Sequence, residues 1–382
     1  MLCSRVVACR LRAGVRPFLV SGCRGMASTV PPDAILEEVG NKGVITLNKP
    51  RTLNALNSNM VRLIYPKLKE WEGTKSMVII KGAGEKAFCA GGDIRSIVDT
   101  LNDPEPLGDY FFKEEYTLNC LIGTLQIPYI ALIDGVTMGG GVGLSVHGQY
   151  RVATERSIFA MPETAIGLFP DVGGSYFLPR LGGSLGMFLA LTGWRLKGRD
   201  VLKAGVATHV CDSARLGELE TSLLSLESFY PEDITNILQK FHNEASFSKD
   251  EPFCLQPVLP QIEACFSGQS VEEIITNLEK DGSEWAKKQL MTIARMSPTS
   301  LKVTHEEITR GANLTLQECL TMENRVVSRL HVHPDFSEGV RAVLIDKDNK
   351  PKWDPATLEG VTRENVESFY QPLEDPSKEL NL

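Results

Sequence analysis

Short apolar runs alternate with amphipathic stretches through the first half of the chain. Residues 44–47 (VITL), 77–80 (MVII) and 130–133 (IALI) have the length of strands, and all but Thr46 are apolar. Helical spacing of apolar residues marks 58–71 and 111–125. Strands that alternate with helices predict an α/β fold whose sheet has crossover connections and strands buried on both faces.

The stretch 58–71 carries two signals that conflict. Ser58 precedes the apolar residues and is expected to cap the N-terminus of a helix. Pro66 lies inside the same span, and proline lacks the backbone N–H that an inner turn uses. We therefore expect a helix that is kinked or interrupted at Pro66.

Strand signals fade after about residue 215, and charged helical patterns replace them. Ser270 and Glu273 form a capping box, and amphipathic stretches follow over 285–295 and 316–330. A soft boundary in the irregular segment that starts near 244 divides the chain. We expect a core domain over 33–240 and a helical C-terminal region over 241–382.

The first 32 residues differ from all that follow. They contain five arginines and no acidic residue, the first being Asp33. Arginine-rich, acid-free N-termini are typical of mitochondrial transit peptides, so 1–32 is expected to direct the chain to the matrix, with cleavage before Pro31 and Pro32. A basic tail without a targeting role is the alternative.

Composition and charge narrow the range of partners. The 382 residues carry a formal net charge of −8, which argues against an overall attraction to nucleic acid or an anionic membrane. No apolar run reaches the roughly 18 residues of a membrane-spanning helix. The nine cysteines lack paired spacing and the six histidines lack HExxH, so we expect reduced thiols and no metal.

Two glycine-rich segments follow apolar strands. Residues 89–94 (CAGGDI) come after the 77–80 strand, and Gly139, Gly140 and Gly141 come after the 130–133 strand. Glycine lets backbone N–H groups approach a ligand, and two that converge on one oxygen form an oxyanion hole. The alternative is a tight turn or a close helix–strand contact.

Two acids follow these glycines. Residues 161–174 place Glu163 and Asp171 among apolar and glycine residues. Backbone donors that face a pair of acids are suited to attack on an activated carbonyl.

Other motifs favour structural interpretations. Residues 139–143 lack the GxGxxG spacing of a dinucleotide site. Residues 182–186 match the GxSxG of hydrolase nucleophiles but lack the preceding strand, so Ser184 is expected to cap a helix. His147 is expected to pack on a helix, and Cys89 to be a small buried residue.

The ordered set of motifs resembles the crotonase (enoyl-CoA hydratase/isomerase) superfamily. The matching segments are 45–50, 53–56, 88–94, 128–131, 139–141, 161–163 and 173–174, with 336–342 resembling the terminal helix region. This resemblance implies a crotonase-type spiral of ββα turns with a helical C-terminal region.

Within that superfamily, 111–116, 161–174 and the extended C-terminal region resemble the branch that hydrolyses (S)-3-hydroxyisobutyryl-CoA. The resemblance implies that Gly92 and Gly140 supply the two N–H donors to the thioester oxygen. It implies Glu163 as the principal catalytic carboxylate, Asp171 as the second acid, and Glu115 as the group that holds the substrate's hydroxyl end. A solvated acid on a helix face is the alternative for Glu115.

Gly143 separates the branches of the superfamily. Hydratases place a catalytic glutamate at this position, so its absence here disfavours hydration. The missing side chain is also expected to leave space at the substrate's Cα–Cβ face.

The implied reaction yields 3-hydroxyisobutyrate and CoA in valine catabolism, with 3-hydroxypropionyl-CoA as a further expected substrate. No cofactor is expected, because CoA is part of the substrate. Glu163 could act as general base or as nucleophile, and the residues do not choose.

Several alternatives stay open at this point. A crotonase-type enoyl-CoA or dienoyl-CoA isomerase is the nearest, and a non-catalytic CoA- or RNA-binding homologue is another. Lys49 and Arg51 are candidates for the CoA phosphates, and a homo-oligomer is open.

Overall fold

The computed structural model describes residues 31–227 and 230–382, and Pro32–Leu382 clusters as one unit. Apart from Pro31 and Pro32, the predicted transit peptide lies outside these residues. The boundary predicted near residue 241 lies inside this unit, so the core domain and the C-terminal region remain a division made from the sequence pattern.

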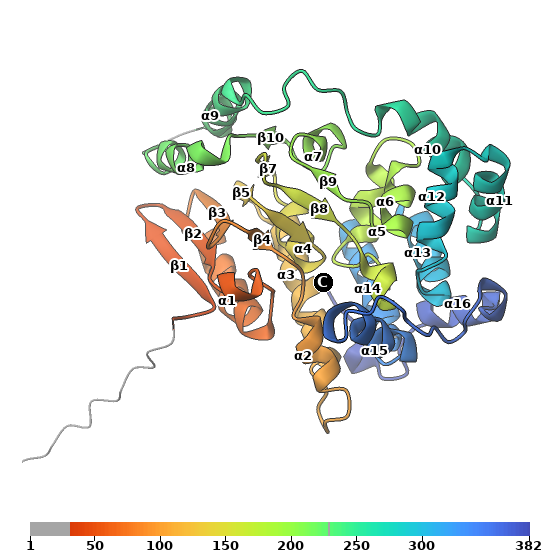
Figure 1. Cartoon of the computed structure of the whole chain (residues 1–382). Coiled ribbons are helices and arrows are strands. Elements are labelled where there is room, and N and C mark those ends of the chain that lie inside the picture. The colour runs from red at the N-terminus through yellow and green to blue at the C-terminus, as the bar shows by residue number, and fades with distance from the viewer. Residues whose placement is uncertain (1–30, 228–229) are drawn as a thin grey trace, which may run out of the picture. The chain divides into compact units, whose positions relative to one another are not determined.

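The strands form two sheets (Figure 1). The larger has the order β1 (Ala34–Val39), β2 (Lys42–Leu47), β3 (Met77–Gly82), β5 (Tyr129–Ile133), β7 (Tyr150–Ala153) and β10 (His209–Val210). The smaller has the order β4 (Ala87–Cys89), β6 (Val136–Met138), β8 (Ile158–Ala160) and β9 (Leu196–Lys197). The β1–β2 and β8–β9 pairs are antiparallel, and the other neighbours are parallel.

Each turn of the chain gives one strand to each sheet. β3 is followed by β4, β5 by β6, and β7 by β8. Helices α2 (Ile94–Asp99) and α3 (Gly108–Thr124) connect the first two turns, and α4 (Gly140–Val146) connects the next two. The predicted spiral of ββα turns is therefore confirmed. The three predicted strands are confirmed within β2, β3 and β5, whereas β1 had no prediction.

The middle of the larger sheet is buried on both faces, as β3 shows. Val78 and Ile80 belong to the main core, and Met77 and Ile79 belong to a second core. The second core is completed by helices α8 (Leu216–Leu224) and α9 (Pro231–Glu244), through Leu219, Leu223, Ile234, Leu238 and Phe241.

Helix α1 (Ser58–Glu72) corrects two expectations. Its N-cap is Asn57, whose side chain accepts a hydrogen bond from the Met60 N–H at 2.9 Å, so the prediction of Ser58 was wrong by one position. The helix also continues through Pro66. Pro66 is exposed, so the carbonyl that it leaves without an N–H partner can face solvent.

After β10 the described chain is helical, as predicted. Following α8 and α9, these helices are α10 (Leu259–Phe266), α11 (Val271–Asp281), α12 (Glu284–Ile293), α13 (Pro298–Gly311), α14 (Leu316–Leu330), α15 (Pro334–Val340) and α16 (Arg363–Tyr370). Three shorter helices, α5 (Gly174–Phe177), α6 (Leu185–Thr192) and α7 (Asp200–Lys203), precede β10. The Ser270 cap of α11 is confirmed by its bond from the Glu273 N–H, at 3.1 Å.

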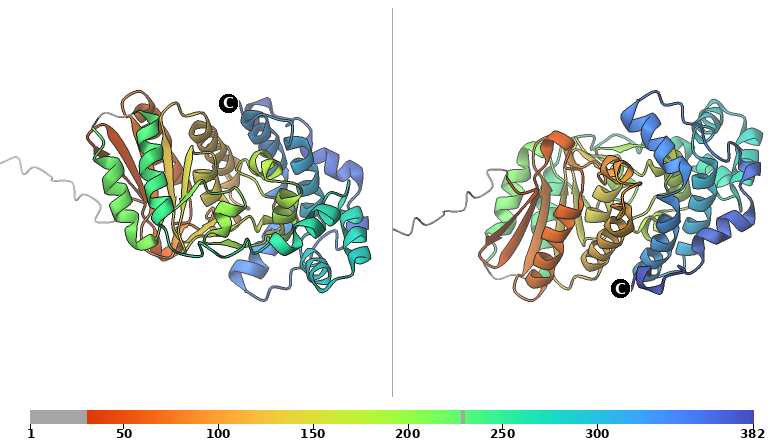
Figure 2. Two further views of the ribbon diagram at one scale, coloured as in Figure 1. Left: turned by 90° about the horizontal axis from the view of Figure 1, so that it is seen from above. Right: turned by 90° about the horizontal axis from the view of Figure 1, so that it is seen from below.

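The C-terminal helices gather beside the strands rather than over them (Figure 2). Helix α14 packs against α3, and α13 packs against α5 and α6. These contacts pack the C-terminal helices against α3, α5 and α6, which follow strands of the smaller sheet. No helix in the described residues is both long and apolar enough to cross a membrane.

Candidate active site

One cavity of about 490 Å³ brings together the glycines and the acids predicted for the site. Gly92 and Gly140 lie in its wall, together with the acids Glu115, Glu163 and Asp171. The chain separates the first and last of these residues widely, so it is the spiral that assembles them.

The smaller sheet sets the positions of three of them. Gly92 follows β4, Gly140 follows β6, and Glu163 follows β8. These strands are parallel neighbours, so their carboxyl ends meet along one edge. Glu115 enters the cavity from α3, and Asp171 from the loop before α5.

The two glycine N–H groups are close to each other. A Cβ built on Gly140 would lie 3.3 Å from the nitrogen of Gly92 and would collide with Oε1 of Glu115. A Cβ on Gly139 would lie 2.9 Å from Oε1 of Glu163. Within the described residues, neither the Gly92 nor the Gly140 N–H donates a hydrogen bond to the protein. The arrangement suits an oxygen bound between them, beside the acids.

Glu115 is buried, which excludes the alternative of a solvated acid. It is only 2% exposed, whereas Lys113 and Glu114 are half-buried and have partners elsewhere. Glu114 pairs with Arg62 at 2.9 Å, and the Lys113 ammonium donates to carbonyls near the C-terminus. Oε1 of Glu115 and Oε2 of Glu163 have no hydrogen-bond partner among the described residues, so both can accept one from a ligand.

The three acids oppose one another's ionisation. Burial raises the pKa of Glu163 well above its usual value, and the charge of Asp171 raises it further. Burial and the charges of Asp171 and Glu163 do the same to the pKa of Glu115. Burial raises the pKa of Asp171 to about 7, and a hydrogen bond from Tyr116 keeps the rise from being larger. Asp171 can therefore both hold and release a proton near neutral pH.

Tyr116 is a residue that sequence reasoning missed. Its hydroxyl donates a hydrogen bond to Oδ2 of Asp171 at 2.8 Å, and its side chain is fully buried. The only signal in the sequence is its place next to Glu115. Neither residue's neighbourhood reveals that Asp171 lies opposite.

The expectation that Gly143 leaves space at the substrate was wrong. A Cβ there would lie 2.7 Å from Cβ of Val172 and 2.8 Å from Nδ2 of Asn119. Gly143 does not line the cavity, because these two side chains occupy the direction in which its own would point. The absence of the glutamate itself stands.

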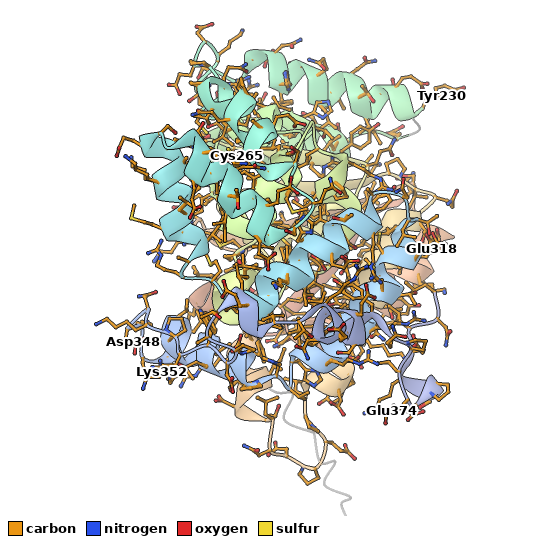
Figure 3. All side chains as sticks on the ribbon, turned by 90° about the vertical axis from the view of Figure 1, so that its right-hand side faces the viewer. Tyr230, Cys265, Glu318, Asp348, Lys352 and Glu374 are labelled. Carbon is orange, nitrogen blue, oxygen red and sulfur yellow. The ribbon has the colours of Figure 1, made fainter. Side chains whose placement is uncertain are left out.

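The C-terminal region closes one side of the cavity, which the sequence did not predict. Val343 and Leu344 come from a short π-helix, η6 (Arg341–Ile345), and Asn349 from the loop that follows. Arg341 anchors this loop through ion pairs with Glu338, Asp346 and Asp348. Figure 3 shows Asp348 and Lys352 on the loop at the molecule's edge.

Two arginines also line the cavity. Arg195 and Arg295 are exposed and form no ion pair within the described residues. They offer positive charge to an anionic ligand. Lys49 and Arg51, the candidates from the sequence, are not among the residues that line this cavity.

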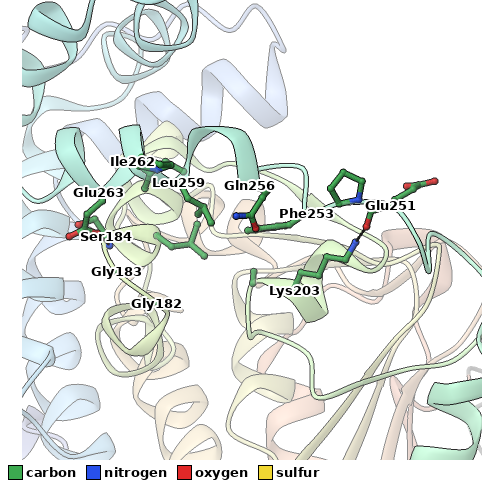
Figure 4. A pocket seen from close by; sticks show the side chains of 14 residues that line it. Gly182, Gly183, Ser184, Lys203, Glu251, Phe253, Gln256, Leu259, Ile262 and Glu263 are labelled. Atoms are coloured by element: carbon green, nitrogen blue, oxygen red, sulfur yellow. Dashed lines mark hydrogen bonds between the residues drawn. The ribbon is translucent and has the colours of Figure 1, made fainter.

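A second cavity, of about 790 Å³, contains the GxSxG segment (Figure 4). The Ser184 N–H donates to Glu263 at 2.7 Å, and none of the site acids lines this cavity. A short helix (Leu178–Arg180) precedes the segment where a nucleophile elbow would need a strand. Ser184 does occupy the N-cap position of α6, although its side chain makes no capping hydrogen bond.

Comparison with known protein families points to the same kind of site. The profile of the enoyl-CoA hydratase/isomerase family matches residues 42–370. The chain belongs to this family. Among similar members, the mitochondrial 3-hydroxyisobutyryl-CoA hydrolase of Homo sapiens is 56% identical over 343 residues, covering 89% of each chain. The Danio rerio protein of the same name is 53% identical over 373 residues, covering 97% of each chain.

Solved structures of the family extend the match to the C-terminal region. A carnitinyl-CoA dehydratase from Mycobacterium thermoresistibile is 34% identical with a TM-score of 0.83, covering 92% of this chain and 99% of that one. An enoyl-CoA hydratase from Rhodobacter sphaeroides 2.4.1 is 34% identical with a TM-score of 0.81, covering 92% of this chain and 100% of that one. The fold is thus that of the family, including the helices after β10.

Proposed function

We propose that the protein hydrolyses the thioester of (S)-3-hydroxyisobutyryl-CoA to 3-hydroxyisobutyrate and CoA, a step of valine catabolism. The observation that carries the proposal is the meeting of three buried acids and two unpaired glycine N–H groups in one cavity. Relatives that are 53–56% identical over most of their length bear the name of this hydrolase. A shorter 3-hydroxyacyl-CoA, 3-hydroxypropionyl-CoA, is a second substrate of the proposal.

The thioester oxygen is held by the N–H groups of Gly92 and Gly140. These donors stabilise the negative charge that develops on the oxygen when the carbonyl is attacked. The unpartnered Oε1 of Glu115 accepts a hydrogen bond from the substrate's hydroxyl. This contact selects a 3-hydroxy group, because an acyl chain without one leaves a buried carboxyl unpaired.

Glu163 and Asp171 share one proton, and the reacting form is the one that carries it on Asp171, because only ionised Glu163 can attack or accept a proton. Ionised Glu163 delivers the attack, and its raised pKa makes its carboxylate a stronger base than an exposed one. Protonated Asp171 gives its proton to the departing thiolate, for which a pKa of about 7 is suited. The reaction uses water and the chain's own groups, so the proposal includes no cofactor or metal.

Glu163 can deliver the attack in two ways. As general base it activates water, and as nucleophile it forms a mixed anhydride that water opens. A single turnover in isotopically labelled water separates them. An enzyme-derived oxygen in the first product identifies the nucleophilic route.

Thiol release from a panel of acyl-CoAs tests the proposal. The panel varies the 3-hydroxyl and the 2-methyl groups and includes an enoyl-CoA and a dienoyl-CoA. Release of CoA from 3-hydroxyacyl esters is expected, whereas conversion without thiol release would identify an isomerase. Glu163→Gln is expected to abolish hydrolysis while binding of the ester survives, and Ser184→Ala to retain activity. Unchanged turnover in Glu163→Gln would refute the assignment.

The CoA portion and the compartment complete the proposal. Arg195 and Arg295 lie at the cavity and can meet CoA phosphates, which carry charge of the opposite sign. The similar hydrolases are named as mitochondrial, and the N-terminal arginines of this chain agree with import into the matrix.

A further inference from the structure

The loop that carries Asp171 has a strained backbone. Val172, the next residue, has a φ of +54°, in the left-handed region that β-branched residues avoid. Gly173 follows with a φ of +83°, which glycine adopts readily. Strain of the kind seen at Val172 persists only where surrounding contacts hold it.

Glu323, far along the chain on α14, supplies such contacts. Its Oε2 accepts a hydrogen bond from the Gly173 N–H at 2.7 Å. Its Oε1 accepts from the Ser175 N–H at 3.0 Å and contacts Oγ of Ser175 at 2.5 Å. Glu323 is fully buried, so these bonds are shielded from water. A further support comes from His147, whose Nε2 donates to the Val172 carbonyl at 2.7 Å.

The position calls for a carboxyl group rather than any polar side chain. Two backbone N–H groups approach the two separate oxygens of Glu323. Glutamine has the same size but only one acceptor oxygen, so its NH₂ would face one of the two N–H donors. A neutral isostere therefore breaks the arrangement without opening a cavity.

We propose that Glu323 is a positioning residue for the hydrolysis: it holds the 171–175 turn so that the Asp171 carboxyl faces Glu163. The inference rests on the proposed function. It assigns a role in the reaction to a helix of the C-terminal region that contributes no residue to the wall of the cavity.

Several titratable groups surround Glu323. They are Asp171 in the turn, Tyr116 on α3, Glu307 on α13, and Cys319 on α14 itself. Replacing Glu323 by a neutral side chain removes one acid beside Asp171. Burial raises the pKa of Glu323 to about 8, so Asp171, with a pKa of about 7, loses its proton while Glu323 is still neutral. The replacement is therefore expected to act through the turn and not through a change of charge.

The test compares Glu323→Gln with Glu307→Gln. Both are fully buried glutamates on consecutive helices, but the carboxyl oxygens of Glu307 have no hydrogen-bond partner within the described residues. For Glu323→Gln we expect kcat to fall by about 10- to 100-fold with little change in KM, because Asp171 is misplaced. Glu307→Gln should keep the kcat of the wild type.

Ser175→Ala keeps the inference testable if Glu323→Gln folds poorly. It removes only the hydroxyl contact, so a smaller loss of kcat is expected, and the double variant should be no slower than Glu323→Gln alone. Equal losses in Glu323→Gln and Glu307→Gln, or additive losses in the double variant, would overturn the proposal.

A crystal structure of Glu323→Gln gives a readout that does not depend on activity. We expect the 171–175 turn to rearrange and Val172 to leave the left-handed region. An unchanged turn would overturn the positioning role. Failure of the proposed function would instead appear in the wild type, as absence of thiol release from every 3-hydroxyacyl-CoA.

Discussion

The phenol of Tyr116 donates a hydrogen bond to Asp171 at 2.8 Å, and both side chains are buried. This bond stabilises the ionised form of Asp171 and lowers its pKa against the effect of burial. The balance between the two effects leaves the acid ready to transfer a proton near neutral pH.

Tyr116→Phe is expected to move the alkaline limb of the pH–rate profile to higher pH. Loss of the donor raises the pKa of Asp171, so its protonated form persists further into the alkaline range. The loss in kcat should be about 10-fold, in keeping with one hydrogen bond to a charged group. Profiles of kcat for both proteins measure this, and a limb that stays in place would contradict the role given to Asp171.

Gly140→Ala is expected to lower kcat by about 100- to 1000-fold, because the methyl group takes the space of Glu115 and disturbs an oxyanion donor. Gly182→Ala is the matched control, since a Cβ there meets no atom within 4 Å. Steady-state thiol release compares the two. Equal activity in both variants would remove Gly140 from the site.

Gly143→Glu should not create a hydratase. The new side chain meets Val172 and Asn119, so we expect a loss of about 1–3 kcal/mol in unfolding free energy instead. Denaturant unfolding and hydration of an enoyl-CoA give the two readouts. A stable variant that hydrates the double bond would show that the pocket can accommodate the glutamate.

Arg195→Ala and Arg295→Ala are each expected to raise KM for the CoA ester by about 10-fold, with kcat retained. A truncated thioester that lacks the phosphates should show no such change, because it offers the arginines no charge. Lys49→Ala is the comparison, since Lys49 lies outside the lining of the cavity. A larger effect at Lys49 would return the phosphates to the site suggested by the sequence.

Glu307→Gln should raise thermal stability more at alkaline than at mildly acidic pH. Burial raises the pKa of Glu307 in the folded protein, so the unfolded chain releases its proton at lower pH. The free energy of unfolding of the wild type therefore falls as pH rises above the ordinary carboxyl range, and glutamine, which does not ionise, removes this loss. Melting curves across pH check it, and a gain that does not depend on pH would contradict it.

The local pattern predicted the strands and the groups that follow them, because apolar runs and glycines act over a few residues. Glu163 and Asp171 could be found in this way. Tyr116 and Glu323 could not, because their partners are distant in the sequence. Tyr116 binds Asp171, 55 residues away, and Glu323 binds Gly173, 150 residues away. The direction of the missing Gly143 side chain also depends on Asn119 and Val172, which only the packing of α3 and α4 brings near.

Gly92, Gly140 and Glu163 follow three neighbouring strands of the smaller sheet, whose spacing is set by backbone hydrogen bonds. A substitution after any one strand can therefore replace a single reacting group while the other two keep their separation. One protein scaffold can therefore diversify in evolution by changes at one strand end at a time, while the fold itself is kept.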